Sequence, residues 1–319
     1  MNLRREPRNL YAGRPARYIA RLLLFSLALP HRTLVASPNA PPITVSKCVA
    51  RNSIVTASVQ GQTGHTYTWA VTGGSNLYGN GTPTVFFTAG GAGTTITISV
   101  VDSSPPCSVT STETVQVDFL DEQATDFYYN DVCTIGRLSI TAGCGGGNYC
   151  PTSPLTRAQM AVLILKAEHT TAYVPPGCHG IFTDVACPSQ YANWIEQLYN
   201  EGITSGCGAS TFCPNDQITR AQMAVFMVKI VHGYCPPGVS NCYQPPPATG
   251  TKFTDVPAGA FAAAWIEQLL ADGHVAKGIC TGAGETLGFA YCPGVANPPS
   301  NTVTRAQMAR FIKKTFALP

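Results

Sequence analysis

The chain has 319 residues, of which only 12% are charged, and its formal net charge at pH 7 is +3. Lysine and arginine form no cluster after residue 21, which argues against binding to nucleic acid. The length allows two or three domains, and the 30 glycines and 25 prolines indicate short elements joined by many turns.

Residues 1–36 resemble a secretory signal peptide. Six arginines precede the apolar run at 22–29, and the segment ends in Leu34-Val35-Ala36, whose last residue is small. The apolar run is too short to span a bilayer, and a disordered basic tail is the alternative interpretation. Thirteen cysteines fit an oxidising compartment better than the cytosol. We therefore expect a secreted, soluble mature chain without a transmembrane segment.

Residues 41–118 have the pattern of an antiparallel β-sandwich. Four runs have the alternating pattern of strands, and Gly-rich turns separate them. The runs are TYTWAV at 66–71, TVFFT at 84–88, TITISVV at 95–101 and TETVQV at 112–117. Cys48 and Cys107 lie near the two ends of this segment, so we predict a disulfide between them that joins the two sheets.

The pentapeptide TRAQM occurs three times, at 156–160, 219–223 and 304–308. A shift of 63 residues places Phe119 on Phe182 without a gap, and it also superposes the residues around the first two pentapeptides.

A third copy begins at Phe253 and repeats the WIEQL of 194–198 at 265–269, with insertions further on. We assign the copies to 119–174, 182–234 and 253–319. A repeat of this length indicates an architecture in which about three copies close one core.

Each copy is predicted to form a helix, a loop and a second helix. Apolar residues of the second copy fall at helical spacing on both sides of a Gly- and Cys-rich loop. They are Tyr191, Trp194, Ile195 and Leu198 on the first helix, and Met223, Phe226, Met227 and Ile230 on the second. Glu196 and Glu267 recur on the first helix, where the same pattern predicts that they face solvent.

The TRAQM motif begins a helix with a capping box. The Thr hydroxyl accepts the backbone N–H of the Gln, and the Gln side chain accepts the backbone N–H of the Thr. The predicted cap residues are Thr156, Gln159, Thr219, Gln222, Thr304 and Gln307. Removing one Thr should cost about 1 kcal/mol.

The arginines of the motif, Arg157, Arg220 and Arg305, are not explained by capping, since a cation is mildly unfavourable at a helix start. Their repetition suggests an anionic partner. It is either the repeat aspartate (Asp121, Asp184 or Asp255) or the acid group of a ligand, and the two are compatible. We expect loss of one arginine to cost about 1 kcal/mol or less, unless it is a buried partner of the aspartate.

These motifs resemble the S-layer homology family over residues 119–319. In the second copy the matching residues are Phe182-Thr183-Asp184-Val185, Trp194, Ile195, Leu198, Gly202-Ile203, Phe212-Cys213-Pro214 and Thr219-Arg220-Ala221-Gln222. The third copy keeps Trp265, whereas the first lacks the Trp. Two features depart from the family pattern: Gln replaces the motif Glu in every copy, and the loops carry paired cysteines.

The resemblance implies a pseudo-threefold α-helical domain whose grooves bind cell-wall carbohydrate, with the motif arginines on the ligand's acid group. By resemblance, the candidate ligand-binding residues are Arg157, Arg220, Arg305, Asp121, Asp184, Asp255, Trp194 and Trp265. The segment 41–118 is similar to the immunoglobulin-like modules of the polycystic-kidney-disease type, which serve as spacers or binding modules. The fold class expected is therefore multidomain, an all-β sandwich followed by an all-α three-repeat domain.

The cysteines pair by position in the repeat. We predict the disulfides Cys144–Cys150, Cys207–Cys213, Cys280–Cys292, Cys178–Cys187 and Cys235–Cys242 beside Cys48–Cys107. A zinc site is disfavoured, because Cys-x-x-Cys pairs and matching His spacing are missing from the sequence. Cys133 is left over, either as a half-buried thiol or as the link of a disulfide dimer.

We interpret the protein as a non-enzymatic protein of the cell surface that binds wall polysaccharide or peptidoglycan, with no cofactor and no metal. The sequence contains no HExxH, GxSxG or Gly-rich phosphate loop. The alternatives are a secreted, disulfide-rich protein that binds a protein partner, or a non-catalytic subunit of a surface assembly.

Overall fold

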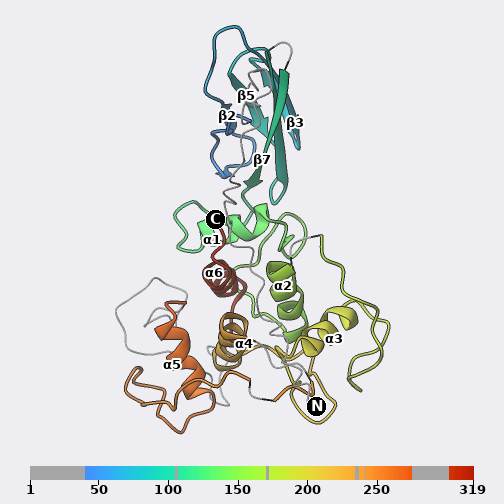
Figure 1. The fold of residues 1–319 in the computed structure, drawn as a ribbon, viewed down its shortest axis with the longest axis vertical. Helices are drawn as coiled ribbons and strands as arrows, with labels where there is room; N and C mark the ends of the chain where they lie inside the picture. The colour runs from blue at the N-terminus through green and yellow to red at the C-terminus, as the bar shows by residue number, and fades with distance from the viewer. Residues whose placement is uncertain (1–39, 105–106, 170–171, 234–236, 241, 275–301) are drawn as a thin grey trace, which may run out of the picture. The chain divides into compact units, whose positions relative to one another are not determined.

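The computed structural model describes residues 40–104, 107–169, 172–233, 237–240, 242–274 and 302–319 (Figure 1). The predicted signal peptide at 1–36 lies outside these residues, as does most of the inter-helix loop of the third copy. The division into a β-rich N-terminal part and a helical C-terminal part is confirmed.

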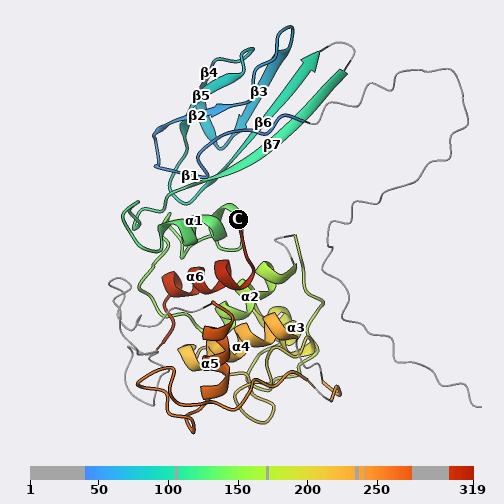
Figure 2. The same ribbon diagram turned by 60° about the vertical axis from the view of Figure 1, so that its left-hand side comes forward.

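The β-rich part consists of two sheets (Figure 2). The strand order is β1-β7-β6-β3 in one sheet and β2-β5-β4 in the other. The strands are β1 (Cys48–Val49), β2 (Ile54–Ser58), β3 (Thr66–Thr72), β4 (Gly74–Tyr78), β5 (Thr84–Ala89), β6 (Thr95–Ser104) and β7 (Cys107–Val117). All pairs within the sheets are antiparallel except β1 with β7, which is parallel.

Alternation along the strands builds a single core between the two sheets. Trp69 of β3, Ile98 of β6 and Phe87 of β5 are each at most 3% exposed and belong to one hydrophobic cluster. Their sequence neighbours on each strand point the other way, as the two-residue period of a strand requires.

The helical part contains a first and a second helix from each copy. The helices are α1 (Tyr129–Arg137), α2 (Arg157–His169), α3 (Ala192–Asn200), α4 (Arg220–His232), α5 (Ala263–Ala271) and α6 (Arg305–Thr315). The second helix of each copy packs against the first helix of the next: α2 on α3, α4 on α5, and α6 back on α1 (Figure 1). The predicted apolar faces supply the contacts, since Ile195, Leu198, Met223 and Met227 are fully buried.

A closed ring of backbone hydrogen bonds lies where the three second helices begin. Leu155, Ile218 and Val303 are the residues immediately before the three TRAQM motifs, and all are fully buried. The N–H of Leu155 donates to the carbonyl of Val303 (2.9 Å), that of Val303 to Ile218 (2.9 Å), and that of Ile218 to Leu155 (3.0 Å). Each residue therefore both donates and accepts, and the ring holds the three helix starts together.

The structure corrects one predicted disulfide: Cys48 is bonded to Cys133 of α1, not to Cys107. The cause is the parallel pairing of β1, in which Cys48 lies opposite Gln116 near the end of β7. Cys107 begins that strand. Nine residues of extended chain span about 30 Å, whereas a disulfide needs Cα atoms about 6 Å apart. Because Cys133 is bonded to Cys48, the prediction that it is a leftover thiol was wrong, and it is not available to link a dimer.

Candidate functional site

All three TRAQM motifs form the predicted capping box. Thr219 accepts the N–H of Gln222 at 3.2 Å, and the Gln222 side chain accepts the Thr219 N–H at 3.1 Å. The pairs at Thr156–Gln159 and Thr304–Gln307 have the same two bonds, between 3.2 and 3.3 Å. The boxes satisfy the Gln N–H at each helix start, while the backbone N–H groups of Arg157 and Arg305 donate to the carbonyls of Asp216 and Ser153 in another copy. The arginine side chains need a separate explanation.

The three arginines are buried, with exposures of 3% for Arg157, 2% for Arg220 and 8% for Arg305. Nε of Arg157 donates to the carbonyl of Phe212 in the second copy at 2.8 Å, and Nε of Arg305 donates to the carbonyl of Tyr149 in the first copy at 2.7 Å. Their guanidinium groups lie 4.8 and 4.9 Å from the centroids of those same rings. Arg157 and Arg305 therefore each tie their own copy to the loop of another copy.

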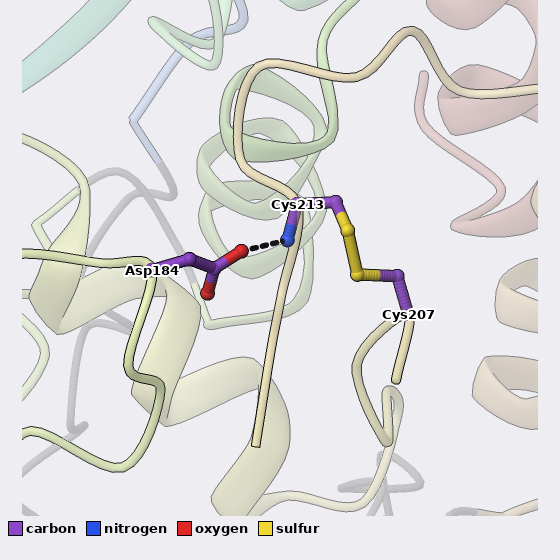
Figure 3. Close-up of side chains that lie close together, drawn as sticks. All are labelled: Asp184, Cys207 and Cys213. Carbon is purple, nitrogen blue, oxygen red and sulfur yellow. Dashed lines mark hydrogen bonds between the residues drawn. A yellow bond between two sulfur atoms is a disulfide. The ribbon is translucent and has the colours of Figure 1, made fainter. Parts of the chain in front are cut away.

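The repeat aspartates hold the same loop residues from the other side. Asp184 accepts the N–H groups of Phe212 and Cys213 at 2.8 and 2.7 Å. Figure 3 shows the bond from Cys213. Asp121 accepts those of Tyr149 and Cys150, both at 2.7 Å. Burial alone would raise the pKa of Asp184, but these donors, with a smaller contribution from Arg157, hold the pKa below its ordinary value. The aspartate thus positions the loop whose carbonyl the arginine binds.

A groove of about 490 Å³ opens beside Arg157, between α4 and α5. The loop 203–207 forms one wall, and Trp265 and Phe261 contribute aromatic rings at the start of α5. Phe261 is 70% exposed. The side chains that line it from α4 are Gln222, Val225, Phe226 and Lys229.

Two cationic side chains, Lys229 and Arg157, line this groove and differ in their hydrogen bonds. Lys229 Nζ donates to the carbonyls of Gly202 and Ile203 at 3.3 and 3.2 Å, and burial lowers its pKa. Nη2 of Arg157 is buried and has no hydrogen-bond partner among the described residues. A buried guanidinium N–H without an acceptor is costly, but this atom is covered by protein, so a ligand anion could reach it only if the surrounding side chains moved.

The predicted site residues do not all meet in one place. Arg157 and Trp265 line this groove, whereas Asp184 faces the loop backbone. Arg305 meets the first-copy loop, where its Nη2 reaches the Thr141 hydroxyl at 3.4 Å. Lys229 and Phe261 were missed, although Lys229 has a counterpart at Lys166, 63 residues earlier.

Three predicted local disulfides are formed: Cys144–Cys150, Cys178–Cys187 and Cys207–Cys213. Cys242 is also disulfide-bonded, while its predicted partner Cys235 and the pair Cys280 and Cys292 lie outside the described residues. Among the residues described, the one cluster of potential metal ligands is Asp184, Cys207 and Cys213 (Figure 3). Its two sulfurs are joined to each other, so they are not thiolate ligands.

Comparisons with known proteins agree with the geometry. The family model of the S-layer homology domain matches residues 182–224. The chain is 38% identical over 86 residues to "Exoglucanase XynX" of Acetivibrio thermocellus, and 28% identical over 100 residues to "Middle cell wall protein" of Brevibacillus brevis. It is also 28% identical over 100 residues to "Surface layer protein" of Brevibacillus choshinensis.

These matches cover 26% to 31% of this chain but only 7% to 9% of the relatives. Within the described residues, every helix is too short or too polar to cross a membrane. The domain match and the surface-protein relatives indicate a location at the surface of the cell envelope. Residues 182–224, which include α3, the groove loop and the start of α4, form an S-layer homology domain.

Proposed function

We propose that the protein anchors itself non-covalently to cell-wall polysaccharide or peptidoglycan through residues 119–319, acting as three S-layer homology repeats. The cyclic packing of α2 on α3, α4 on α5 and α6 on α1 supports this grouping, as does the closed ring at Leu155, Ile218 and Val303. The β-rich part is an immunoglobulin-like module that acts as a spacer or binding head.

The observation that carries the proposal is the groove that Arg157 and Trp265 line together. A carboxylate on a sugar in this groove would be attracted to the Arg157 guanidinium, and the rings of Trp265 and Phe261 would cover the apolar faces of neighbouring sugars. Nη2 of Arg305 donates to the Thr141 hydroxyl, whereas Nη2 of Arg157 has no partner among the described residues. Of these two arginines, we therefore place the site at Arg157.

The same geometry favours a role without catalysis. His169 and His232, which recur in the repeat, are bonded to Glu201 at 2.6 Å and to Asp272 at 3.0 Å, and each stacks on a tyrosine. Asp121 and Asp184 are occupied by loop N–H groups. The two histidines thus join neighbouring copies, and the two aspartates hold the loops of their own copies, which supports structural roles for all four.

Binding of the full chain to isolated sacculi, with and without their attached acidic polymer, tests the function. We expect Arg157→Lys to weaken binding at least tenfold, because lysine keeps the charge but loses the Nη2 donor. Trp265→Ala should have a similar effect.

Arg305→Lys is the matched control, since it makes the same change at an equivalent helix start whose Nη2 is already bonded. Both Lys variants should lose similar stability, but only Arg157→Lys should lose the polymer. Normal binding by folded Arg157→Lys and Trp265→Ala proteins would refute the groove as the wall-binding site.

A further inference from the structure

The outer face of the β2-β5-β4 sheet carries exposed apolar side chains remote in sequence from the helical groove. Ile54, Tyr78 and Phe86 are 78%, 67% and 43% exposed. Val85 and Phe87 of β5 point into the core, so Phe86 and Thr88 point outward. Clusters of this kind on a soluble domain mark interaction sites.

Strand pairing sets the outward side chains in two rows across the sheet. Phe86 is paired with Thr56 on β2 and with Tyr78 on β4, while Thr88 is paired with Ile54. Paired residues share a face, so each row mixes apolar and hydroxyl groups. Ile54, Asn76, Tyr78, Phe86 and Thr88 line an open hollow of about 590 Å³.

A local distortion of β4 directs Asn76 over this hollow. Asn76 has a φ of 53°, in the left-handed region, and the register of β4 shifts between Ser75 and Tyr78. Its Nδ2 donates to the hydroxyl of Thr88 at 3.3 Å, which sets the amide beside the aromatic rings. Bulges re-aim side chains and are common next to functional sites, and asparagine adopts a positive φ readily.

The charge of the face indicates what kind of ligand it fits. The strands β2, β4 and β5 contain no Asp, Glu, Lys or Arg, whereas β6 and β7 of the other sheet carry Asp102 and Glu113. An uncharged face complements a neutral ligand and gives no electrostatic attraction to an anion or cation. The bulge in the edge strand β4 also interrupts the regular N–H and C=O row that an added peptide strand would need.

We infer that this face binds an uncharged polysaccharide. The rings of Tyr78 and Phe86 cover the C–H faces of consecutive sugars, and the Asn76 amide and Thr88 hydroxyl exchange hydrogen bonds with sugar hydroxyls. This site is independent of the groove at Arg157.

Calorimetric titration of the full chain with cellohexaose and with chitohexaose tests the inference. We expect saturable binding to at least one of them, with at least a tenfold loss of affinity in Phe86→Ala and in Tyr78→Ala. Asn76→Gly should also weaken binding while preserving the fold, because glycine accepts the positive φ without strain. Circular dichroism checks that each variant is folded.

Val174→Ala is the matched control, since Val174 is 80% exposed but lies outside the sheet. The affinity of this variant for the hexasaccharide should stay within twofold of that of the parent. Arg157→Lys should also keep hexasaccharide binding, which separates this site from the wall-binding groove. The inference is overturned if neither hexasaccharide binds or if the Phe86 and Tyr78 variants bind normally. It also fails if sedimentation shows self-association that Phe86→Ala abolishes, because the face would then belong to a second copy.

Discussion

At the scale of single residues, the surroundings of Glu122 disfavour the ionised form of its carboxyl group. Its side chain is 4% exposed, and its Oε1 is buried without a hydrogen-bond partner in the described part of the chain. Burial raises its pKa to about 7, although the N–H of Phe119 partly opposes that shift, and nearby carboxylates such as Asp121 and Asp118 add to it. The folded protein therefore holds a proton on Glu122 at a pH where an unfolded chain has released it.

Glu122 should make the protein less stable as the pH rises. Below about pH 4.5 Glu122 is protonated in both states and does not affect stability. Between there and about pH 7 it ionises in the unfolded state but not in the folded state, which lowers the free energy of unfolding. The decrease in the free energy of unfolding reaches about 3 kcal/mol above pH 7. We therefore expect Glu122→Gln to raise the Tm at pH 8 relative to the parent. A difference in Tm between the two proteins that stays constant from pH 4 to pH 8 would contradict this.

Arg157 should stabilise the fold more than the cap residue Thr219. Arg157→Ala leaves the buried carbonyl of Phe212 without its donor and removes the stacked guanidinium, so we expect a cost of about 3 kcal/mol. Thr219→Ala removes one capping bond and should cost about 1 kcal/mol. Chemical denaturation of both variants measures the difference, and the opposite order would show that the arginine's contacts add little.

At the scale of elements, the same position on the first helix of each copy bonds to a segment that precedes that helix in the chain. Glu196 of α3 accepts the N–H groups of His179, Gly180 and Ile181 at 2.5 to 2.8 Å. Glu267 of α5 accepts those of Thr249 and Gly250 at 2.9 and 2.7 Å. Cys133, the equivalent residue of α1, bonds to Cys48 instead. The prediction that the two glutamates face solvent was wrong for Glu196, which is 4% exposed.

Glu196→Ala should release the connector that precedes α3. Three N–H groups lose a charged acceptor, so we expect faster amide exchange at residues 179–181 and a loss of about 2–3 kcal/mol in stability. Gln197→Ala is the neighbouring control on the same helix. Hydrogen exchange that is unchanged at 179–181 in Glu196→Ala would show that the connector is held by other contacts.

Features that depend on contacts between residues close in the sequence could be predicted, whereas features that depend on distant residues could not. Capping boxes and apolar helix faces depend on residues three or four apart, so Thr219, Gln222 and Met223 could be assigned from the sequence alone. The groove could not, because Arg157 meets Phe212 across 55 residues, and only the packing of successive copies brings them together. The helical period placed Glu196 toward solvent, but the incoming connector covers that face.

At the scale of the whole molecule, the β-rich part is joined to the first helical copy by more than the chain itself. Arg51 donates its backbone N–H to Asp118 at 2.9 Å and its Nη1 to the carbonyl of Phe119 at 3.0 Å. The disulfide between Cys48 and Cys133 adds a covalent link across 85 residues. These bonds tie the start of the β-rich part to Phe119 and to α1.

The Cys48–Cys133 disulfide should therefore contribute more stability than any of the local loop disulfides. Loop-entropy arithmetic gives about 4.5 kcal/mol for closing 85 residues but about 2 kcal/mol for closing 6, as in Cys207–Cys213. We expect the double variant Cys48→Ser/Cys133→Ser to lower the free energy of unfolding about twice as much as Cys207→Ser/Cys213→Ser, measured by denaturant titration under oxidising conditions. Peptide mapping without reduction should recover Cys48 and Cys133 in one linked pair. A linked peptide of Cys48 with Cys107, or equal costs for the two double variants, would mean that the β-rich part is not fastened to α1.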